Sequence, residues 1–343
     1  MDSRTFPSPF ISKARIVVVI PAFQAAQHIR RVIAGIPPFV SRIIVVDDCS
    51  SDETAALVSC DSADDPRLVL VRHTVNQGVG GAMLTGYQKA LDLGADIIVK
   101  MDADDQMDPA YLLPLIAPIL SREADYTKGN RFLRTRELRA MPVARRIGNL
   151  GLSFMTKVGS GQWPIFDPTN GYTAIHASIV PLLNQAAIDR RYFYESSMLL
   201  ELGLLRAVVR DVPIPARYQD ETSHLSKRKA FLEFPRRLFR GLLRRLWLEY
   251  FVRDFTGVSA FMVSGLVLLL WGGAFCAYHW FLSSRTGVVA STGTVMLAVL
   301  PIILGIQLLL QATIADIQNA PVRPLHPDLV IIETLRNDLG KRA

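Results

Sequence analysis

Two carboxylates one residue apart, Asp102 and Asp104, follow a short apolar segment at residues 96–101. Such a segment is typical of a buried strand, and open α/β sheets bind their ligands at the carboxyl ends of the strands. A carboxylate pair of this kind suits a hard divalent cation such as Mg²⁺ or Mn²⁺, which in turn holds a diphosphate. Solvated turns also contain closely spaced carboxylates, so the pair alone leaves both interpretations open.

A second acidic cluster follows the apolar segment at residues 42–46. Ser50 or Ser51 is predicted to cap the next helix, with two acidic residues in its first turn. Asp47 and Asp48 precede that cap, and a carboxylate at a strand end is well placed to accept hydrogen bonds from a ribose or a base. Capping and ligand binding are both consistent with this cluster, and the other strand–Asp site favours a nucleotide.

The elements that must position these carboxylates form a regular alternation. Short apolar segments rich in β-branched residues alternate with segments of helical length, which is typical of parallel βαβ units. We therefore predict an α/β fold with a mostly parallel central sheet. The predicted strands are residues 15–20, 42–46, 67–71 and 96–101, and the predicted helices between them are residues 25–35, 52–59 and 80–93.

The length of 343 residues allows one sizeable α/β domain and an appendage, and half of the residues are hydrophobic. Much of this hydrophobicity is local, because residues 255–282 and 286–315 contain no Asp, Glu, Lys or Arg. Each stretch exceeds the roughly 20 residues that span a bilayer. Buried core helices rarely run so long without charge. We predict two transmembrane helices, at about residues 255–282 and 290–315, followed by a cytosolic tail at residues 316–343.

Basic residues gather immediately before the first apolar stretch. Residues 227–254 contain nine Lys and Arg against three acidic residues, nearly the whole excess of +7 in the chain. Aromatic residues and leucines interleave with them at helical spacing, which predicts a basic amphipathic juxtamembrane helix. A nucleic-acid patch is the competing interpretation. Adjacency to the apolar hairpin favours anionic membrane lipids, and we expect no nucleic-acid partner.

We expect the large N-terminal part of the chain, residues 1–226, to lie in the cytoplasm. Residues 1–14 lack the apolar region of a signal peptide, and positive charge next to a membrane helix marks the cytoplasmic side. Three scattered cysteines indicate neither a disulfide framework nor a zinc site. The predicted location is the inner (cytoplasmic) membrane, with multi-pass topology.

An ordered set of motifs over roughly residues 14–225 resembles family 2 glycosyltransferases. The subsequent hairpin and basic helix make the layout similar to that of the polyprenyl-phosphate hexose synthases, including the dolichol-phosphate mannose synthases, which serve glycan synthesis such as that of the cell envelope. The motifs are Ile20-Pro21-Ala22-Phe23, Val46-Asp47-Asp48-Cys49-Ser50, Asn76-Gln77-Gly78-Val79-Gly80, Asp102-Ala103-Asp104-Asp105-Gln106 and Gly129-Asn130-Arg131.

The resemblance implies a GT-A fold, a nucleotide-sugar donor and inversion at the anomeric carbon. It also implies that Asp102 and Asp104 bind Mg²⁺ or Mn²⁺. One departure is Gln24-Ala25, which stands where the family commonly has Asn and an acidic residue, and this puts the identity of the base in doubt. The implied donor-binding residues are Pro21, Ala22, Phe23, Asp48, Gly78, Asp102, Ala103, Asp104 and Gln106.

The implied acceptor is a polyprenyl phosphate, whose second pKa near 6 leaves it mostly dianionic at neutral pH. Such an acceptor needs no base for deprotonation, but it needs cations near the donor diphosphate. Arg131, Arg145 and Arg146 are the candidates for binding the acceptor phosphate, with Arg131 foremost because it follows the Gly129-Asn130 turn. A surface or membrane-facing role is the alternative for Arg145 and Arg146.

Three residues are candidates for a catalytic role: Arg131, Asp167 and Glu195. Asp167 lies in a segment that resembles the family's acceptor-side loop, where it is either a base or part of an Asp-Pro turn. Glu195 resembles the acidic position before the last helix of the domain, where it either orients the acceptor or caps that helix.

The predicted function is inverting transfer of a sugar from a UDP- or GDP-hexose to a membrane polyprenyl phosphate. The alternatives are a glycosyltransferase acting on another lipid or glycan, a nucleotidyltransferase, or a non-catalytic membrane scaffold. A processive polysaccharide synthase is disfavoured because the Q-x-x-R-W signature is absent and two spans are too few for a pore. Assembly into a homo-oligomer is left open by the sequence.

Overall fold

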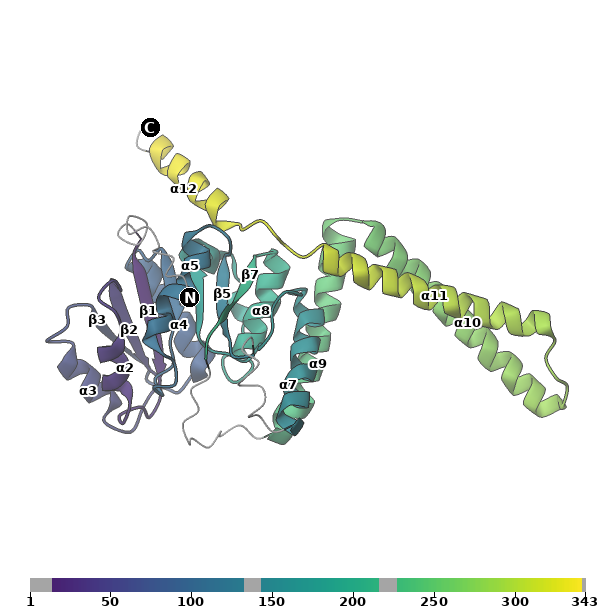
Figure 1. Ribbon diagram of the computed structural model, residues 1–343, viewed down its shortest axis with the longest axis horizontal. Coiled ribbons are helices and arrows are strands. Elements are labelled where there is room, and N and C mark those ends of the chain that lie inside the picture. The colour runs from purple at the N-terminus through teal and green to yellow at the C-terminus, as the bar shows by residue number, and fades with distance from the viewer. Residues whose placement is uncertain (1–13, 133–142, 216–226, 341–343) are drawn as a thin grey trace. The chain divides into compact units, whose positions relative to one another are not determined.

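The computed structural model describes residues 14–132, 143–215 and 227–340, apart from some side chains in the helices at the edges of these ranges (Figure 1). The chain divides into two compact units. The first comprises Met1–Gly241 together with Pro321–Ala343, and the second comprises Leu242–Ala320.

A seven-stranded sheet forms the centre of the first unit, in the order β3-β2-β1-β4-β6-β5-β7. β6 runs antiparallel to its neighbours β4 and β5, and every other neighbouring pair is parallel. The predicted mostly parallel sheet is confirmed. The strands are β1 (Ile16–Ala22), β2 (Arg42–Asp47), β3 (Leu68–Arg72), β4 (Ile97–Lys100), β5 (Tyr126–Asn130), β6 (Thr173–His176) and β7 (Val209–Pro213).

Helices cover both faces of this sheet (Figure 1). Successive side chains of β1 point to opposite faces, so Val18 enters one apolar core and Val19 enters the other. Because both faces are buried, the central strands consist of nearly continuous apolar residues. The first core contains α2 (Ile29–Gly35), α3 (Thr54–Asp61) and α5 (Leu112–Leu120), and the second contains α4 (Gly78–Asp92) and α8 (Tyr194–Leu205).

The helix α3 begins differently from the prediction. Its N-cap residue is Glu53, which makes no side-chain capping bond, so the prediction that Ser50 or Ser51 caps this helix is wrong. The Ser50 hydroxyl instead accepts from the Gln24 backbone N–H at 3.0 Å, and the Ser51 hydroxyl accepts from the Gln24 side chain at 3.3 Å. The serines therefore bind the loop after β1 rather than the end of α3.

Short 3-10 turns and the helices α7 and α12 also belong to the first unit. α7 (Val143–Ser160) packs against α8, and α12 (His326–Gly340) follows the second unit in the chain. The 3-10 turns are η1 (Pro109–Tyr111), η2 (Ala177–Leu182) and η3 (Gln185–Ala187).

The start of α12 is bound to the sheet by the buried carboxylate of Asp125, which precedes β5. This carboxylate accepts from the backbone N–H groups of Val208, Leu325 and His326, and it contacts the His326 ring nitrogen Nδ1 at 2.9 Å. Burial alone raises the pKa of Asp125, but these hydrogen bonds outweigh it and hold the pKa below its usual value. The C-terminal segment is thereby an integral part of the first unit.

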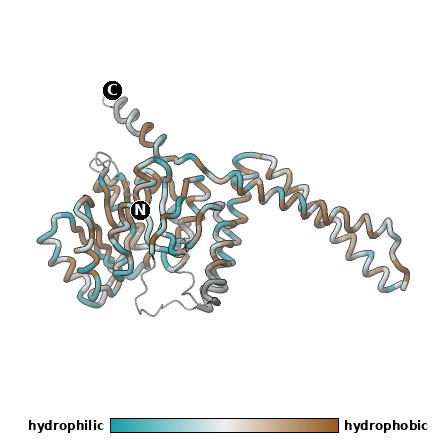
Figure 2. The backbone as a smooth tube through the Cα atoms, in the orientation of Figure 1, coloured by the Kyte–Doolittle hydropathy of each residue, from teal (hydrophilic) through white to brown (hydrophobic). Residues whose placement is uncertain are grey.

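Two long apolar helices dominate the second unit. They are α10 (Gly257–Thr286) and α11 (Thr292–Gln318), and both are long and apolar enough to cross a membrane (Figure 2). Only 11% of the most apolar window of each helix is buried, whereas a core helix of a soluble protein is mostly buried. A Cβ added to Gly265 would lie 3.0 Å from the Gly305 carbonyl, so these small residues permit close packing of the two backbones.

A charged cluster joins the two ends of the second unit. The basic helix α9 (Lys227–Trp247) begins in the first unit and continues into a π-helix, η4 (Leu248–Arg253). The Arg245 guanidinium donates to both carboxylate oxygens of Asp316 at 2.7 and 2.9 Å, and the Tyr250 hydroxyl donates to the same carboxylate. Because Arg245 and Asp316 are buried, this ion pair fixes the end of α9 to the end of α11.

Candidate active site

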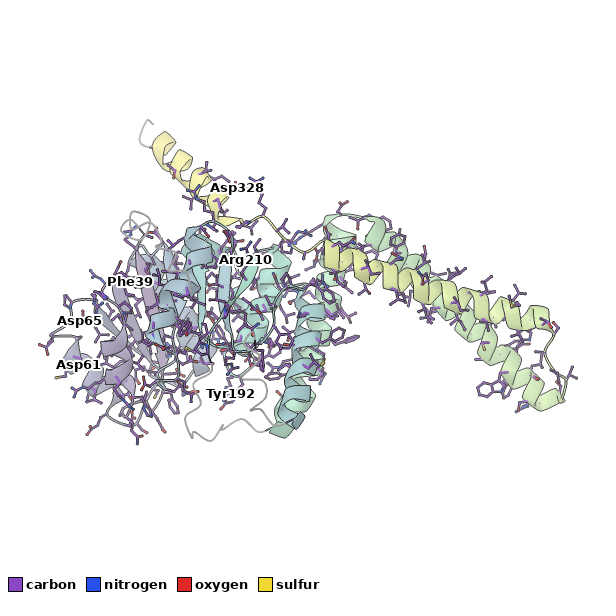
Figure 3. The ribbon with its side chains drawn as sticks, viewed as in Figure 1. Phe39, Asp61, Asp65, Tyr192, Arg210 and Asp328 are labelled. Atoms are coloured by element: carbon purple, nitrogen blue, oxygen red, sulfur yellow. The ribbon has the colours of Figure 1, made fainter. Side chains whose placement is uncertain are left out.

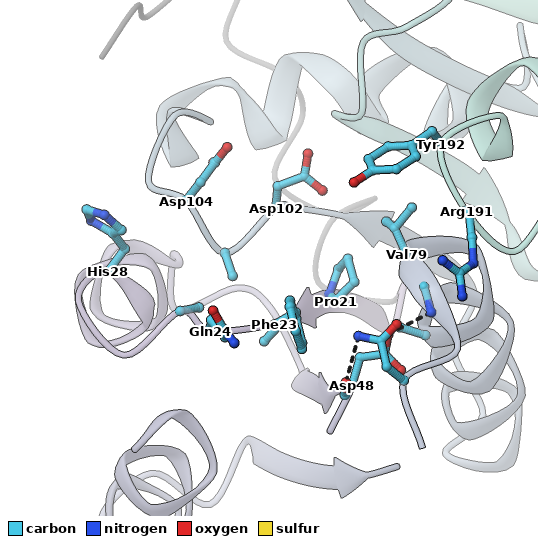
Figure 4. A pocket seen from close by; sticks show the side chains of 16 residues that line it. Pro21, Phe23, Gln24, His28, Asp48, Val79, Asp102, Asp104, Arg191 and Tyr192 are labelled. Atoms are coloured by element: carbon cyan, nitrogen blue, oxygen red, sulfur yellow. Dashed lines mark hydrogen bonds between the residues drawn. The ribbon is translucent and has the colours of Figure 1, made fainter. Parts of the chain in front are cut away.

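A cavity of about 950 Å³ opens at the carboxyl ends of β1, β2 and β4 (Figure 4). Its size lies in the range of small-molecule sites. The structure brings together eight of the nine predicted donor-binding residues in its lining: Pro21, Ala22, Phe23, Asp48, Gly78, Asp102, Ala103 and Asp104. The ninth, Gln106, is not part of the lining, and its backbone N–H donates to Asp104 Oδ1 at 3.1 Å.

The Asp48 carboxylate organises the turn between β3 and α4. It accepts from the backbone N–H group of Gly78 at 2.7 Å (Figure 4). It also accepts from the Gln77 N–H at 2.8 Å and contacts His73 Nδ1 at 2.7 Å. The other ring nitrogen of His73 contacts the Thr85 hydroxyl at 2.9 Å. Protein donors therefore occupy much of this carboxylate, and Asp48 shapes the cavity wall as well as lining it.

A buried lysine joins Asp102 to Glu195. The Lys100 ammonium lies 2.6 Å from Asp102 Oδ1 and 3.4 Å from Glu195 Oε1, and it donates to the Gly171 carbonyl at 3.3 Å. Burial alone lowers the pKa of Lys100, but the two carboxylates outweigh it and raise the pKa above its ordinary value. Burial raises the pKa of Glu195, against the opposing effect of Lys100. This cluster connects the predicted metal site to the first turn of α8.

Gly171 lies against this cluster without room for a side chain. A Cβ at this position would lie 2.5 Å from Lys100 Nζ and 2.6 Å from Asp102 Oδ2. A glycine therefore lets the 167–171 segment pass directly behind the Asp102 carboxylate.

Asp167 lies at the other end of that segment and binds Arg131. Arg131 Nε donates to Oδ2 at 2.8 Å and Nη2 donates to Oδ1 at 2.9 Å, which is a bidentate ion pair. Burial alone raises the pKa of Asp167, but the bonds from Arg131 hold it below the usual value. The Asn170 N–H donates to the Asp167 carbonyl at 3.2 Å, so the segment also forms the turn that was the alternative interpretation.

A second buried lysine, Lys128, binds backbone carbonyls at the start of this segment. The Lys128 ammonium donates to the carbonyls of Phe166 and Asp167, and it lies 3.9 Å from the Asp211 carboxylate. Burial, the largest cause, lowers the pKa of Lys128 and raises that of Asp211. Asp211 also accepts from the Phe166 N–H at 2.6 Å. Asp167 is thus held through its backbone as well as through its carboxylate.

Arg145 and Arg146 lie in α7, but their side chains are outside the described residues. Sequence reasoning did not single out Lys100, Arg191 or Tyr192. A lysine inside an apolar strand was an available signal for Lys100. Arg191 and Tyr192 line the cavity from far along the chain, and no local pattern marks them.

Comparison with known proteins agrees with this fold. Residues 17–181 match the family described as Glycosyl transferase family 2. A solved structure of Mycobacterium tuberculosis glucosyl-3-phosphoglycerate synthase superposes with a TM-score of 0.51 at 20% identity, over 69% of this chain and 82% of that one. This likeness is one of fold, and the fold class is GT-A.

Curated relatives cover a similar part of the chain. UDP-N-acetylglucosamine–dolichyl-phosphate N-acetylglucosaminyltransferase of Methanococcus voltae is 31% identical over 218 residues, which cover 60% of this chain and 86% of the relative. Undecaprenyl-phosphate mannosyltransferase of Micrococcus luteus is 27% identical over 203 residues, covering 58% of this chain and 82% of the relative. Polyprenol monophosphomannose synthase of Mycolicibacterium smegmatis is 29% identical over 184 residues, with coverages of 52% and 67%. The chain belongs to glycosyltransferase family 2 and is an enzyme that transfers sugars.

Proposed function

We propose that this enzyme transfers a hexose, with inversion, from a UDP- or GDP-sugar to a membrane polyprenyl phosphate. Three relatives support the acceptor class, since their names specify dolichyl phosphate, undecaprenyl phosphate and a polyprenol monophosphomannose product. The name of one relative supports a UDP-sugar donor.

The observation that carries the proposal is the 167–171 segment, which joins the two halves of the site. At one end Asp167 holds the Arg131 guanidinium, and at the other end Gly171 contacts Lys100 beside Asp102. The donor diphosphate would bind at Asp102 and Asp104 in the cavity, and the acceptor phosphate would bind at Arg131. A segment that is hydrogen-bonded at both ends supports in-line transfer of the sugar from the donor diphosphate to the acceptor phosphate.

The residues present fit a divalent cation. Asp102 and Asp104 line the same cavity, and the Asp102 side chain is about one-third exposed toward it. Within residues 14–132, 143–215 and 227–340 no group of three metal-ligating side chains occurs, so diphosphate oxygens and water would complete the coordination of Mg²⁺ or Mn²⁺. When bound there, the cation would neutralise charge that develops on the departing diphosphate.

The chemistry assigns different tasks to the carboxylates. A phosphate oxygen of the acceptor attacks the anomeric carbon, the bond to the diphosphate breaks, and the nucleoside diphosphate leaves with that electron pair. No proton has to leave the acceptor. Asp167 is buried and forms an ion pair with Arg131, and its pKa lies below the usual value. In this proposal Asp167 therefore positions Arg131 instead of acting as a base. Glu195 holds Lys100 at the donor end.

The membrane part of the proposal rests on α10 and α11. A polyprenyl acceptor resides in a bilayer, and an enzyme with two spanning helices at about residues 255–282 and 290–315 stays close to it. Residues 1–226 would lie in the cytoplasm below the cytoplasmic membrane, and the basic residues of 227–254 would contact anionic lipid headgroups.

The test uses the purified full-length protein in detergent with Mn²⁺ and radiolabelled UDP-N-acetylglucosamine, UDP-glucose or GDP-mannose. Undecaprenyl phosphate, dolichyl phosphate and the soluble 3-phosphoglycerate serve as alternative acceptors. We expect label in the organic phase with one donor and a polyprenyl phosphate, lost in Asp102→Asn and retained in Asp64→Asn, an exposed carboxylate. Transfer to 3-phosphoglycerate alone would contradict the polyprenyl acceptor.

A further inference from the structure

We infer that the segment Asp189-Arg190-Arg191-Tyr192-Phe193 forms a donor-binding wall, in which Arg191 binds the diphosphate and Tyr192 covers it, and that α9 holds this wall in position. The inference rests on the proposed function, because it concerns the same nucleotide-sugar donor. It adds two binding residues and one positioning contact that the motifs do not contain.

Two exposed aromatic rings face into the cavity. Tyr192 is 59% exposed and Phe23 is 52% exposed, although large aromatic side chains are usually buried. In Figure 4 the Tyr192 hydroxyl is directed toward Asp102, while Phe23 lies on the side of Asp48. A donor bound between Asp48 and Asp102 would bury part of both rings, with Tyr192 over the diphosphate end.

The negative charge of the cavity lining favours a cation at the position of Arg191. Three carboxylates line the cavity, those of Asp48, Asp102 and Asp104, and a diphosphate adds further negative charge. Arg191 is the one Arg or Lys in the described lining, and its exposed guanidinium makes no hydrogen bond or ion pair with any residue in the described part of the chain. A guanidinium in this state suits a phosphate, which it can bind through two parallel hydrogen bonds.

Glycines at the start of α4 fix the backbone of the wall. The Gly80 N–H donates to the Arg190 carbonyl at 2.9 Å. A Cβ at Gly78 would lie 2.3 Å from the Arg190 carbonyl, and one at Gly80 would lie 2.1 Å from the Asp189 carbonyl. The wall therefore lies directly against the helix whose first turn Asp48 organises.

Helix α9 holds the wall from the other side. Arg237 forms an ion pair with Asp189, and its guanidinium lies 5.5 Å from the centroid of the Phe193 ring. Phe193 also makes an edge contact with Phe234 at 5.0 Å between ring centroids. Asp189 Oδ1 in turn accepts from the Arg191 N–H at 2.8 Å. Arg237 is thus two contacts away from the donor cavity and is a positioning residue.

The experiment is calorimetric titration of the full-length protein in detergent with UDP and with GDP, each with Mn²⁺. We expect Arg191→Ala to weaken binding of the preferred nucleotide about tenfold or more, the loss of a charged hydrogen bond. Tyr192→Ala should weaken it about threefold to tenfold. Arg42→Ala is the matched control, because Arg42 lies at the opposite, amino end of β2. Wild-type affinity in both cavity variants overturns the inference.

The contribution of α9 is tested with Arg237→Ala and Arg237→Lys. The alanine variant should weaken nucleotide binding severalfold with an unchanged melting temperature, and lysine should restore it. Arg210→Ala is the control, because Arg210 forms an exposed ion pair with Glu123 elsewhere on the same unit (Figure 3). Equal affinities in Arg237→Ala and wild type overturn the positioning role. A wild-type protein that binds neither nucleotide overturns the proposed function itself, which is a separate outcome.

Discussion

Arg131 and Asp167 form a two-point ion pair, with Nε–Oδ2 at 2.8 Å and Nη2–Oδ1 at 2.9 Å. The Asp167 side chain is almost fully buried, whereas one-third of the Arg131 side chain is exposed. The carboxylate thus anchors a guanidinium whose outer part meets solvent. This arrangement orients Arg131 while part of its side chain stays exposed.

Replacing Arg131 by Lys tests the acceptor assignment. Lysine keeps the charge but lacks the planar fork, so we expect kcat/KM for polyprenyl phosphate to fall about 100-fold. Donor affinity should change less than about twofold. Acceptor kinetics and donor calorimetry on the same variant provide the measurement. A collapse of donor affinity with unchanged acceptor KM would assign Arg131 to the diphosphate site.

Replacing Asp104 by Asn tests the cation site. We expect activity to fall more than about 100-fold, because the departing diphosphate loses a charged metal ligand. The wild-type enzyme should lose activity in EDTA and regain it with Mn²⁺ or Mg²⁺. Thermal unfolding of the variant should match wild type. Full activity in excess EDTA would exclude the metal-dependent reaction.

Gly171→Ala tests how closely the 167–171 segment must approach the proposed cation site. The new methyl group would meet Lys100 Nζ and Asp102 Oδ2, so we expect kcat to fall about tenfold or more. Gly151→Ala is the matched control, because a Cβ at Gly151 meets no atom within 4 Å. That control should retain activity and gain about 0.5–1 kcal/mol in stability from helix propensity. Normal kinetics in Gly171→Ala would refute the close approach.

His176 should make the protein sensitive to acid. Burial, together with the stacked His326 ring, lowers the pKa of His176 to about 4, against opposing effects of Asp96 and Asp125. The unfolded chain therefore takes up this proton first, and stability falls as pH drops from about 6.5 to about 4 by up to roughly 3 kcal/mol. His176→Asn should reduce the pH dependence of the melting temperature over that range. An equally steep acid limb in the variant would assign the effect to other groups.

Exposed arginines of α9 should make activity depend on anionic lipid. Arg236 and Arg240 are exposed, and each basic residue near an anionic surface contributes about 1 kcal/mol of attraction. We expect the double variant Arg236→Gln/Arg240→Gln, in nanodiscs, to lose most of the stimulation by phosphatidylglycerol. High salt should reduce the wild-type rate similarly. Equal lipid dependence of variant and wild type would indicate that these arginines do not contact the headgroups.

The parts of the site that the sequence predicts are those carried by strand ends. Asp102 and Asp104 follow β4 and reach the predicted cavity, because parallel strands end at one edge of a sheet. Local patterns do not predict tertiary pairing. The bonds of Asp48 to the start of α4 and the approach of Arg191 to the same helix join residues distant along the chain. The prediction that Ser50 caps α3 is wrong for the same reason, since the backbone N–H of Gln24, distant along the chain, donates to the Ser50 hydroxyl.

The clamp between Asp125 and the start of α12 has a consequence for the order of synthesis. Leu325 and His326 supply the partners of a fully buried carboxylate, and they are translated after both apolar helices. Until they arrive, Asp125 keeps only the Val208 N–H among the partners described above, and an uncompensated buried charge is strongly destabilising. The first unit therefore completes its folding only after the ribosome has made both α10 and α11, although neither helix belongs to that unit.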